Sequence, residues 1–125
     1  MPDEPVPDDL RDFILRHIDS VAQLEALLLL RANPDEKWDV AKTAERLYAG
    51  EQEVAATLAR MCADGLLQCQ EGIFRYAPEP TALRATVDRL ADLYARHLIP
   101  VTNLIHAKPR RIRQFADAFK FKKDR

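Results

Sequence analysis

The sequence predicts a mainly α-helical protein that carries one small β-hairpin. Along most of its 125 residues, apolar side chains recur every three or four positions, which is the period of a helix with one buried face. The chain holds only 3 glycines, so few helix-breaking residues interrupt that pattern. Between residues 67 and 76 the pattern changes to two alternating segments around Glu71 and Gly72, which is typical of a hairpin with a two-residue turn.

Length and composition indicate a single soluble domain. Hydrophobic residues make up 47% of the chain and charged residues 31%, as in ordinary globular proteins. The longest apolar run, residues 26–30, is far shorter than the ~20 residues that cross a bilayer, and the acidic, proline-broken first residues do not form a signal peptide. We therefore expect no transmembrane segment and a cytoplasmic location.

Two helices are expected after a leader at residues 1–7. Asp8–His17 is the first, and Ser20 with Gln23 three residues later forms a capping box that starts the second. The end of the second helix is apolar almost all round, so we expect this helix at the centre of the domain. Its buried stripe is Val21, Leu24, Leu27 and Leu28.

Two further helices are expected between residues 39 and 65. Asp39 is a good N-cap for the first, and Gly50 supplies the sharp corner before the second, which spans Glu51–Ala63. Gly65 ends the second helix, where a left-handed residue is usually needed. The apolar faces are Ala41, Ala44 and Leu47 in the first helix, and Val54, Leu58 and Met61 in the second.

The turn at Glu71-Gly72 fixes the register of the hairpin. It pairs Leu67 with Tyr76, Gln68 with Arg75, Cys69 with Phe74, and Gln70 with Ile73. Because side chains alternate along a strand, one face holds Leu67, Cys69, Phe74 and Tyr76 and is expected to be buried. Gln68 and Arg75 then face the solvent.

Two small helices with a tight corner, followed by a hairpin, resemble a winged helix-turn-helix. The residues that carry the resemblance are Ala41, Ala44, Leu47, Gly50, Val54, Leu58, Met61 and Gly65-Leu66-Leu67. The chain looks similar to bacterial transcriptional regulators of the MarR and PadR type over about 60 residues, and such a likeness identifies a fold better than a function. It implies that the link around Trp38 lies beside the hairpin, with Trp38 in the core or at the sheet edge.

The resemblance implies duplex DNA as the partner, with the Glu51–Ala63 helix in the major groove. Candidate contacts are polar and basic side chains of this region and of the C-terminal tail: Lys42, Gln52, Thr57, Arg60, Arg75, Arg110, Arg111 and Arg113. Glu51 and Glu53 oppose this interpretation, because they place carboxylates at the helix end that normally approaches phosphates. The alternative is a winged helix that serves as a protein–protein interaction module and does not bind DNA.

Residues 78–107 are expected to form a helical segment after the domain at residues 8–77. Leu83, Val87, Leu90 and Tyr94 recur at heptad-like spacing on the helix that follows Thr81. We expect this seam to form a homodimer, which would place two reading helices on one face of DNA. The alternative is that the seam folds back onto the core of its own chain.

Residues 108–125 form a basic tail with a net charge of +6 in a chain whose overall charge is −1. Ile112, Phe115 and Phe119 give it an apolar stripe. We expect an electrostatic docking arm that contacts DNA phosphates, an acidic or membrane-associated protein, or anionic lipid. The alternative is that its stripe packs on the domain and its charges are solvated.

The sequence predicts no catalytic residue, metal or cofactor, and thus no enzyme. His17, His97 and His106 stand singly, without a second ligand at metal spacing. Cys62 and Cys69 lack a metal-binding spacing, so we expect both to be buried as small apolar residues, with redox sensing as the less favoured alternative. The chain also has no glycine-rich phosphate loop and no nucleophile elbow.

Overall fold

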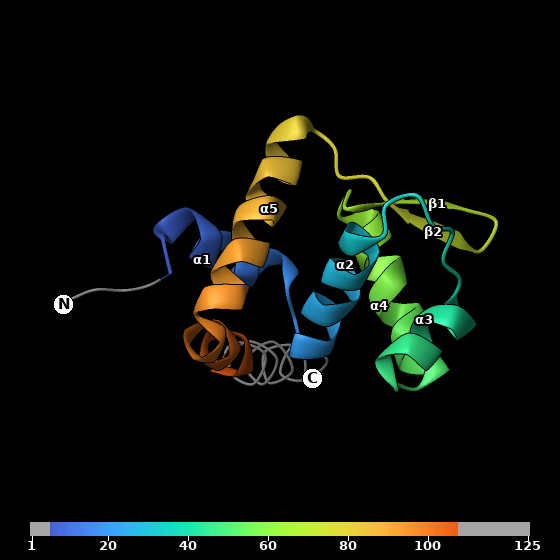
Figure 1. Ribbon diagram of the computed structural model, residues 1–125, viewed down its shortest axis with the longest axis horizontal. Coiled ribbons are helices and arrows are strands. Elements are labelled where there is room, and N and C mark those ends of the chain that lie inside the picture. The colour runs from blue at the N-terminus through green and yellow to red at the C-terminus, as the bar shows by residue number, and fades with distance from the viewer. Residues whose placement is uncertain (1–5, 108–125) are drawn as a thin grey trace, which may run out of the picture.

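A computed structural model gives the fold of this protein and describes residues 6–107. As predicted, the described chain is mainly helical with one two-stranded antiparallel sheet (Figure 1). Its elements in chain order are α1 (Asp8–His17), α2 (Val21–Ala32), α3 (Val40–Leu47), α4 (Glu51–Ala63), β1 (Leu67–Gln70), β2 (Ile73–Tyr76), α5 (Thr81–Arg96) and a helix at 98–107.

Helix α2 lies at the centre of the molecule, as its apolar sequence predicts. In Figure 1, α3, α4 and the hairpin lie on one side of it, and α1 and α5 lie on the other. Leu24, Leu27 and Leu30 of α2 are fully buried. The buried apolar residues form one cluster that runs from Val6 to Ile105, so residues 78–107 share a core with residues 8–77.

Side-chain caps begin α2 and α3 where the sequence predicts them. The backbone N–H of Gln23 donates to Ser20 Oγ at 3.0 Å, and that of Lys42 donates to Asp39 Oδ1 at 2.7 Å. The Gln23 side chain reaches back in turn, because its Oε1 accepts from the backbone N–H of Asp19 at 2.8 Å. These bonds fix the turn that joins α1 to α2.

The corner between α3 and α4 differs from the prediction. Tyr48, and not Gly50, takes the left-handed conformation, with φ 55°, whereas Gly50 is extended with φ −72°. The prediction for Ala41 was also wrong, since Ala41 is exposed and Thr43 is fully buried in its place. Thr43 can be buried because its hydroxyl donates to the Asp39 carbonyl at 2.8 Å.

The hairpin has the predicted register in all four pairs. Both turn residues have positive φ, 52° at Glu71 and 79° at Gly72, as a type I′ turn requires. Trp38 is fully buried and pairs with Phe74 through backbone hydrogen bonds of 3.0 and 2.7 Å, so the link before α3 does lie beside the hairpin. Gly65, with φ 81°, ends α4 as predicted.

The apolar seam of α5 packs within the chain. Val87 and Leu90 are fully buried, and Leu83 and Tyr94 are half-buried against the same core. Arg89 of α5 pairs with Asp9 of α1, and Arg31 of α2 donates to Asp88 of α5 at 3.0 Å. The sequence left two alternatives for this seam, a homodimer contact and packing on the core of its own chain. The structure of the single chain agrees with the second.

Candidate interaction surface

The outer side of α3 and α4 presents a set of exposed side chains that we call the α3–α4 surface. Four of the eight candidate contacts, Lys42, Gln52, Thr57 and Arg60, lie on these two helices. Its members are Glu45, Arg46, Tyr48, Glu51, Gln52, Glu53 and Ala56. Three of these seven residues are glutamates and one is an arginine, so the surface carries a net negative charge.

Tyr48 projects from the corner between α3 and α4. Its side chain is 96% exposed, the most exposed large hydrophobic residue of the described chain. Its backbone is left-handed, a conformation that β-carbons disfavour and that glycine or asparagine usually adopts. The corner is held by the backbone N–H of Ala49, which donates to the Ala44 carbonyl at 3.0 Å. The aromatic ring therefore contributes little to the packing of the fold.

The start of α4 is acidic. Glu51, Gln52 and Glu53 are all exposed, and the two carboxylates lie in the first turn of the helix. Gly50, the N-cap residue, has no side chain that could accept from the free backbone N–H groups. The two carboxylates lie near the positive end of the helix dipole and stabilise it. Within the described part of the chain, no salt bridge joins either glutamate to a basic side chain.

Arg60 is anchored inside the chain. Its Nη1 donates to Asp19 Oδ2 at 2.5 Å, its Nη2 donates to the Arg16 carbonyl at 3.2 Å, and its Nε donates to Asp64 Oδ2 at 3.3 Å. His17 Nδ1 lies 3.1 Å from the same Asp64 oxygen. The network ties the end of α4 to the turn between α1 and α2. A DNA phosphate would therefore have to share the guanidinium with two carboxylates.

Lys42 is paired as well. Its Nζ lies 2.7 Å from Glu36 Oε2 and donates to the Lys37 carbonyl at 3.2 Å. The same ammonium lies 4.6 Å from the centre of the Trp38 ring, and the Arg46 guanidinium lies 5.4 Å from it. Both cations thus cover the buried tryptophan at the base of the hairpin.

The remaining candidate contacts are less constrained or lie beyond the described chain. Gln52 and Arg75 are exposed, and Thr57 is half-buried. Arg75 lines a shallow hollow on the outer face of the hairpin together with Lys37 and Gln68. The other three candidates, Arg110, Arg111 and Arg113, lie in the basic tail outside the described residues.

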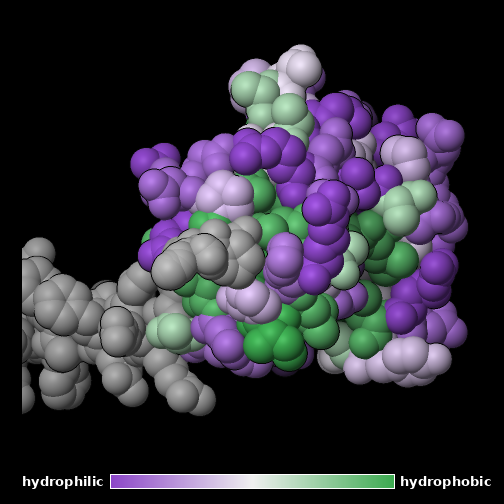
Figure 2. Space-filling view, turned by 60° about the vertical axis from the view of Figure 1, so that its left-hand side comes forward, coloured by the Kyte–Doolittle hydropathy of each residue, from purple (hydrophilic) through white to green (hydrophobic). Residues whose placement is uncertain are grey.

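A second surface exposes apolar side chains on the opposite side of the molecule. The chain breaks its helical course at His97, and the next two residues, Leu98 and Ile99, are 49% and 63% exposed. Leu15 of α1 is also exposed. Figure 2 shows hydrophobic areas between hydrophilic residues on this face.

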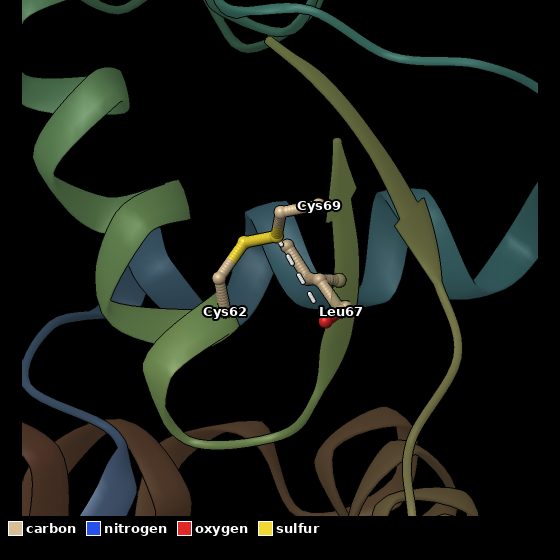
Figure 3. The surroundings of a disulfide bond; sticks show 3 residues. All are labelled: Cys62, Leu67 and Cys69. Carbon is tan, nitrogen blue, oxygen red and sulfur yellow. Dashed lines mark hydrogen bonds between the residues drawn. A yellow bond between two sulfur atoms is a disulfide. The ribbon is translucent and has the colours of Figure 1, made fainter. Parts of the chain in front are cut away.

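Cys62 and Cys69 form a disulfide bond, which corrects the prediction that both are buried as small apolar residues (Figure 3). Cys62 lies half-buried in the last turn of α4, and Cys69 lies exposed on β1, with 6.2 Å between their Cα atoms. The left-handed turn at Gly65 brings them together, since Leu66 N–H then donates back to the Met61 carbonyl at 3.0 Å. The bond joins α4 to the hairpin.

Tyr94 has a strongly raised pKa. Its hydroxyl donates to Glu25 Oε2 at 2.7 Å and links α5 to α2. Burial, and then the hydrogen bond to the Glu25 carboxylate, raise the pKa of Tyr94 to about 12. This hydrogen bond again places a residue of the predicted dimer seam in contacts within the chain.

No family model, curated protein or solved structure matches this chain. Within residues 6–107, no helix is long and apolar enough to cross a membrane. No group of three or more His, Cys, Asp or Glu side chains in the same residues could hold a metal ion.

Three features of this region were not predicted from the sequence: the exposed Tyr48, the Arg60 network and the disulfide. Arg60 and Asp64 are four residues apart on one helix, so this pair was visible in the sequence. The disulfide could have been suspected, because the hairpin register and the turn at Gly65 together return Cys69 to the end of α4. Nothing in the sequence indicates the left-handed conformation of Tyr48, because an aromatic residue rarely adopts it.

Proposed function

We propose that this chain is a winged helix-turn-helix module whose α3–α4 surface binds another protein. Two helices meeting at a tight corner, the hairpin that follows them, and the pairing of Trp38 with Phe74 support this fold type. Because a winged helix can bind either DNA or protein, the fold does not decide between these two functions. The exposed side chains of the α3–α4 surface and their charges decide between them.

The pairing of the basic side chains carries the proposal. DNA affinity depends mainly on free lysine and arginine side chains that neutralise phosphates. Here Arg60 is held by Asp19 and Asp64, and Lys42 is held by Glu36. At the start of α4, the end that would approach DNA, two glutamates are exposed instead. A protein partner with basic groups matches this surface better than a phosphate backbone does.

Tyr48 is the residue that we place at the centre of the contact. Exposed aromatic side chains that become buried in a complex often contribute a large share of the binding free energy. Tyr48 combines nearly complete exposure with a backbone conformation that glycine would adopt at lower cost. Its side chain is therefore better explained by a contact with a partner than by the stability of the fold.

Site-specific photo-crosslinking in the cells that make the protein tests this proposal. A photoreactive phenylalanine derivative replaces Tyr48, and a matched control carries it at Ala85, an exposed position on α5. We expect a protein adduct of discrete mass at position 48, absent at position 85 and lost when Glu51→Lys and Glu53→Lys reverse the local charge. Adducts with DNA, or the same adducts at both positions, would contradict the proposal.

A DNA-binding regulator of the kind that the chain resembles is the second candidate. The order of corner, helix and hairpin favours it, as do the exposed Gln52 and Arg75. The basic tail at 108–125 would then have to supply most of the phosphate contacts. A homodimer through Val87 and Leu90 is not part of either candidate, because both side chains are buried in the core of the single chain.

A further inference from the structure

The disulfide between Cys62 and Cys69 is the covalent link between α4 and the hairpin. Cys69 lies on the strand face that is turned to α4, two residues after the buried Leu67 (Figure 3). The loop that the bond closes is short and contains the end of α4 and the turn at Gly65. Any change at this bond therefore acts directly on the position of β1 relative to α4.

We propose that Cys62 and Cys69 are a reversible thiol–disulfide site that exchanges with small-molecule disulfides of the glutathione class and fixes the hairpin against α4. Oxidation begins when the Cys69 thiolate attacks glutathione disulfide, which forms a mixed disulfide and releases one glutathione. Cys62 then attacks the Cys69 sulfur and releases the second glutathione. The two protein thiols lose two electrons, one glutathione disulfide gains them, and the two thiol protons end on the released glutathione.

The exposure of the two cysteines supports exchange. Cys69 is exposed and Cys62 is half-buried, so a small thiol reaches the bond from the solvent. Accessible disulfides are the ones that exchange readily, whereas structural disulfides in secreted domains are usually protected from reduction. The order of attack follows from the same difference in exposure, because Cys69 meets the reagent first.

The packing of the hairpin explains why it would respond. Gln68, Cys69 and Gln70 of β1 are all exposed, and in β2 only Tyr76 is buried, with Phe74 half-buried. A two-stranded hairpin is marginally stable by itself. Besides the disulfide, the buried ends of the strands and the backbone pairing of Trp38 with Phe74 hold it to the domain. Reduction removes the covalent link at the middle of β1 and leaves the outer half of the hairpin free to move.

Equilibration of the full chain in buffers of graded glutathione to glutathione disulfide ratio tests the exchange. Free thiols are then trapped with N-ethylmaleimide and counted by intact mass. We expect both cysteines to oxidise together, with a midpoint inside the series. A protein that stays oxidised in reduced glutathione alone, stays reduced in glutathione disulfide alone, or stops at the mixed disulfide would overturn the proposal.

Hydrogen exchange on the oxidised and reduced protein tests the effect on the hairpin. We expect amides of residues 70–73, in the outer half of the hairpin, to exchange about tenfold faster after reduction, while those of α1 and α5 keep their rates. A Cys62→Ser/Cys69→Ser variant should match the reduced protein in both buffers. Equal hairpin rates in the two redox states would overturn the proposal. Neither measurement involves a binding partner, so the outcome does not depend on the function proposed above.

Discussion

The guanidinium of Arg60 illustrates how a residue that looks like a DNA contact in the sequence can have a structural role. It is a basic side chain on the helix expected to enter the major groove, but its three nitrogens donate to Asp64, Asp19 and the Arg16 carbonyl. Several charge-assisted hydrogen bonds that share one guanidinium are worth more than an isolated surface pair. Arg60 therefore stabilises the contact between α4 and the α1–α2 turn.

Replacing Arg60 should destabilise the fold measurably. We expect Arg60→Ala to lower the free energy of unfolding by about 1–2 kcal/mol, because three partners lose their donor. Arg96→Ala is the matched control, since Arg96 pairs with Asp92 four residues away on the exposed side of α5. That variant should lose at most ~0.5 kcal/mol. Urea denaturation measures both, and equal losses would show that the Arg60 network has no special role.

Tyr94 gives the fold a dependence on alkaline pH. Its pKa in the folded chain, about 12, lies above the ordinary tyrosine value of 10.0, so its contribution to stability is complete below pH 10. As pH rises through this window, the phenol ionises first in the unfolded chain, and that contribution is lost. Tyr76, whose pKa burial also raises, adds to the same trend.

The Tyr94→Phe variant isolates this effect. Unfolding free energies of the wild type should fall between about pH 10 and pH 12, and those of Tyr94→Phe should fall less steeply. A tyrosinate absorbance titration of the folded protein should show one fewer late-titrating group in the variant. Identical slopes in the two proteins would mean that Tyr94 is not held protonated by Glu25 and burial.

At the scale of elements, local rules predicted most of the described chain. The Glu71-Gly72 turn sets the hairpin register because a two-residue turn leaves only one pairing, and all four pairs are found. Ser20 and Asp39 mark helix starts because their side chains accept backbone N–H groups that would otherwise lack partners. These features depend on neighbours in sequence, so the sequence is sufficient to predict them.

Features that depend on distant residues were less predictable. Cys69 was placed correctly on the face of Leu67, but its pairing with Cys62 depends on where α4 ends and how Gly65 turns the chain. The corner was assigned to Gly50 from residue type, whereas Tyr48, the C-cap of α3, takes the left-handed conformation. The candidate site was predicted from residue type too, whereas the ion pair of Arg60 with Asp19 joins residues that lie far apart in the sequence.

The predicted place of α4 in the core can be checked with one side chain. Leu58 is fully buried, so Leu58→Ala should lower the free energy of unfolding by about 2–5 kcal/mol through lost burial and the cavity that remains. Leu98→Ala is the control, because Leu98 is 49% exposed and should cost less than ~1 kcal/mol. A Leu58→Ala protein as stable as the wild type would show that α4 is rotated from its described position.

At the scale of the whole molecule, one continuous core joins α5 to the helix and hairpin region. Val87 and Leu90 belong to the same buried cluster as Leu24 and Leu58. The ion pair of Arg89 with Asp9 and the hydrogen bond of Tyr94 to Glu25 connect α5 to α1 and α2. The α5 seam is thus part of the domain, and it is not an exposed stripe that awaits a second copy.

A charge placed in the α5 seam distinguishes these alternatives. Val87→Asp should unfold the protein or lower its free energy of unfolding by about 3 kcal/mol or more, because an aspartate would be buried without a partner. Ala85→Asp, on the exposed side of the same helix, should leave stability within about 0.5 kcal/mol. Circular dichroism and sedimentation measure both properties. A Val87→Asp protein that stays folded and changes from dimer to monomer would restore the dimer seam.

The proposed function depends on whether the α3–α4 surface and the hairpin make contact with DNA. The basic tail has a net charge of +6 and is expected to give the full chain some sequence-independent attraction to nucleic acid. A DNA-binding assay on the wild type alone would measure that attraction together with any DNA contact made by α4. The decisive comparison is therefore between the wild type and a protein that lacks the exposed candidates Gln52 and Arg75.

Binding of labelled duplex DNA across a salt series, measured by fluorescence anisotropy for the full-length wild type and for Gln52→Ala/Arg75→Ala, tests the central claim most directly. A protein-binding α3–α4 surface predicts the same affinity and the same slope against log salt for both proteins. A loss of about tenfold or more in the variant, with a slope reduced by about one, would contradict it and identify α4 and the hairpin as a DNA-reading surface.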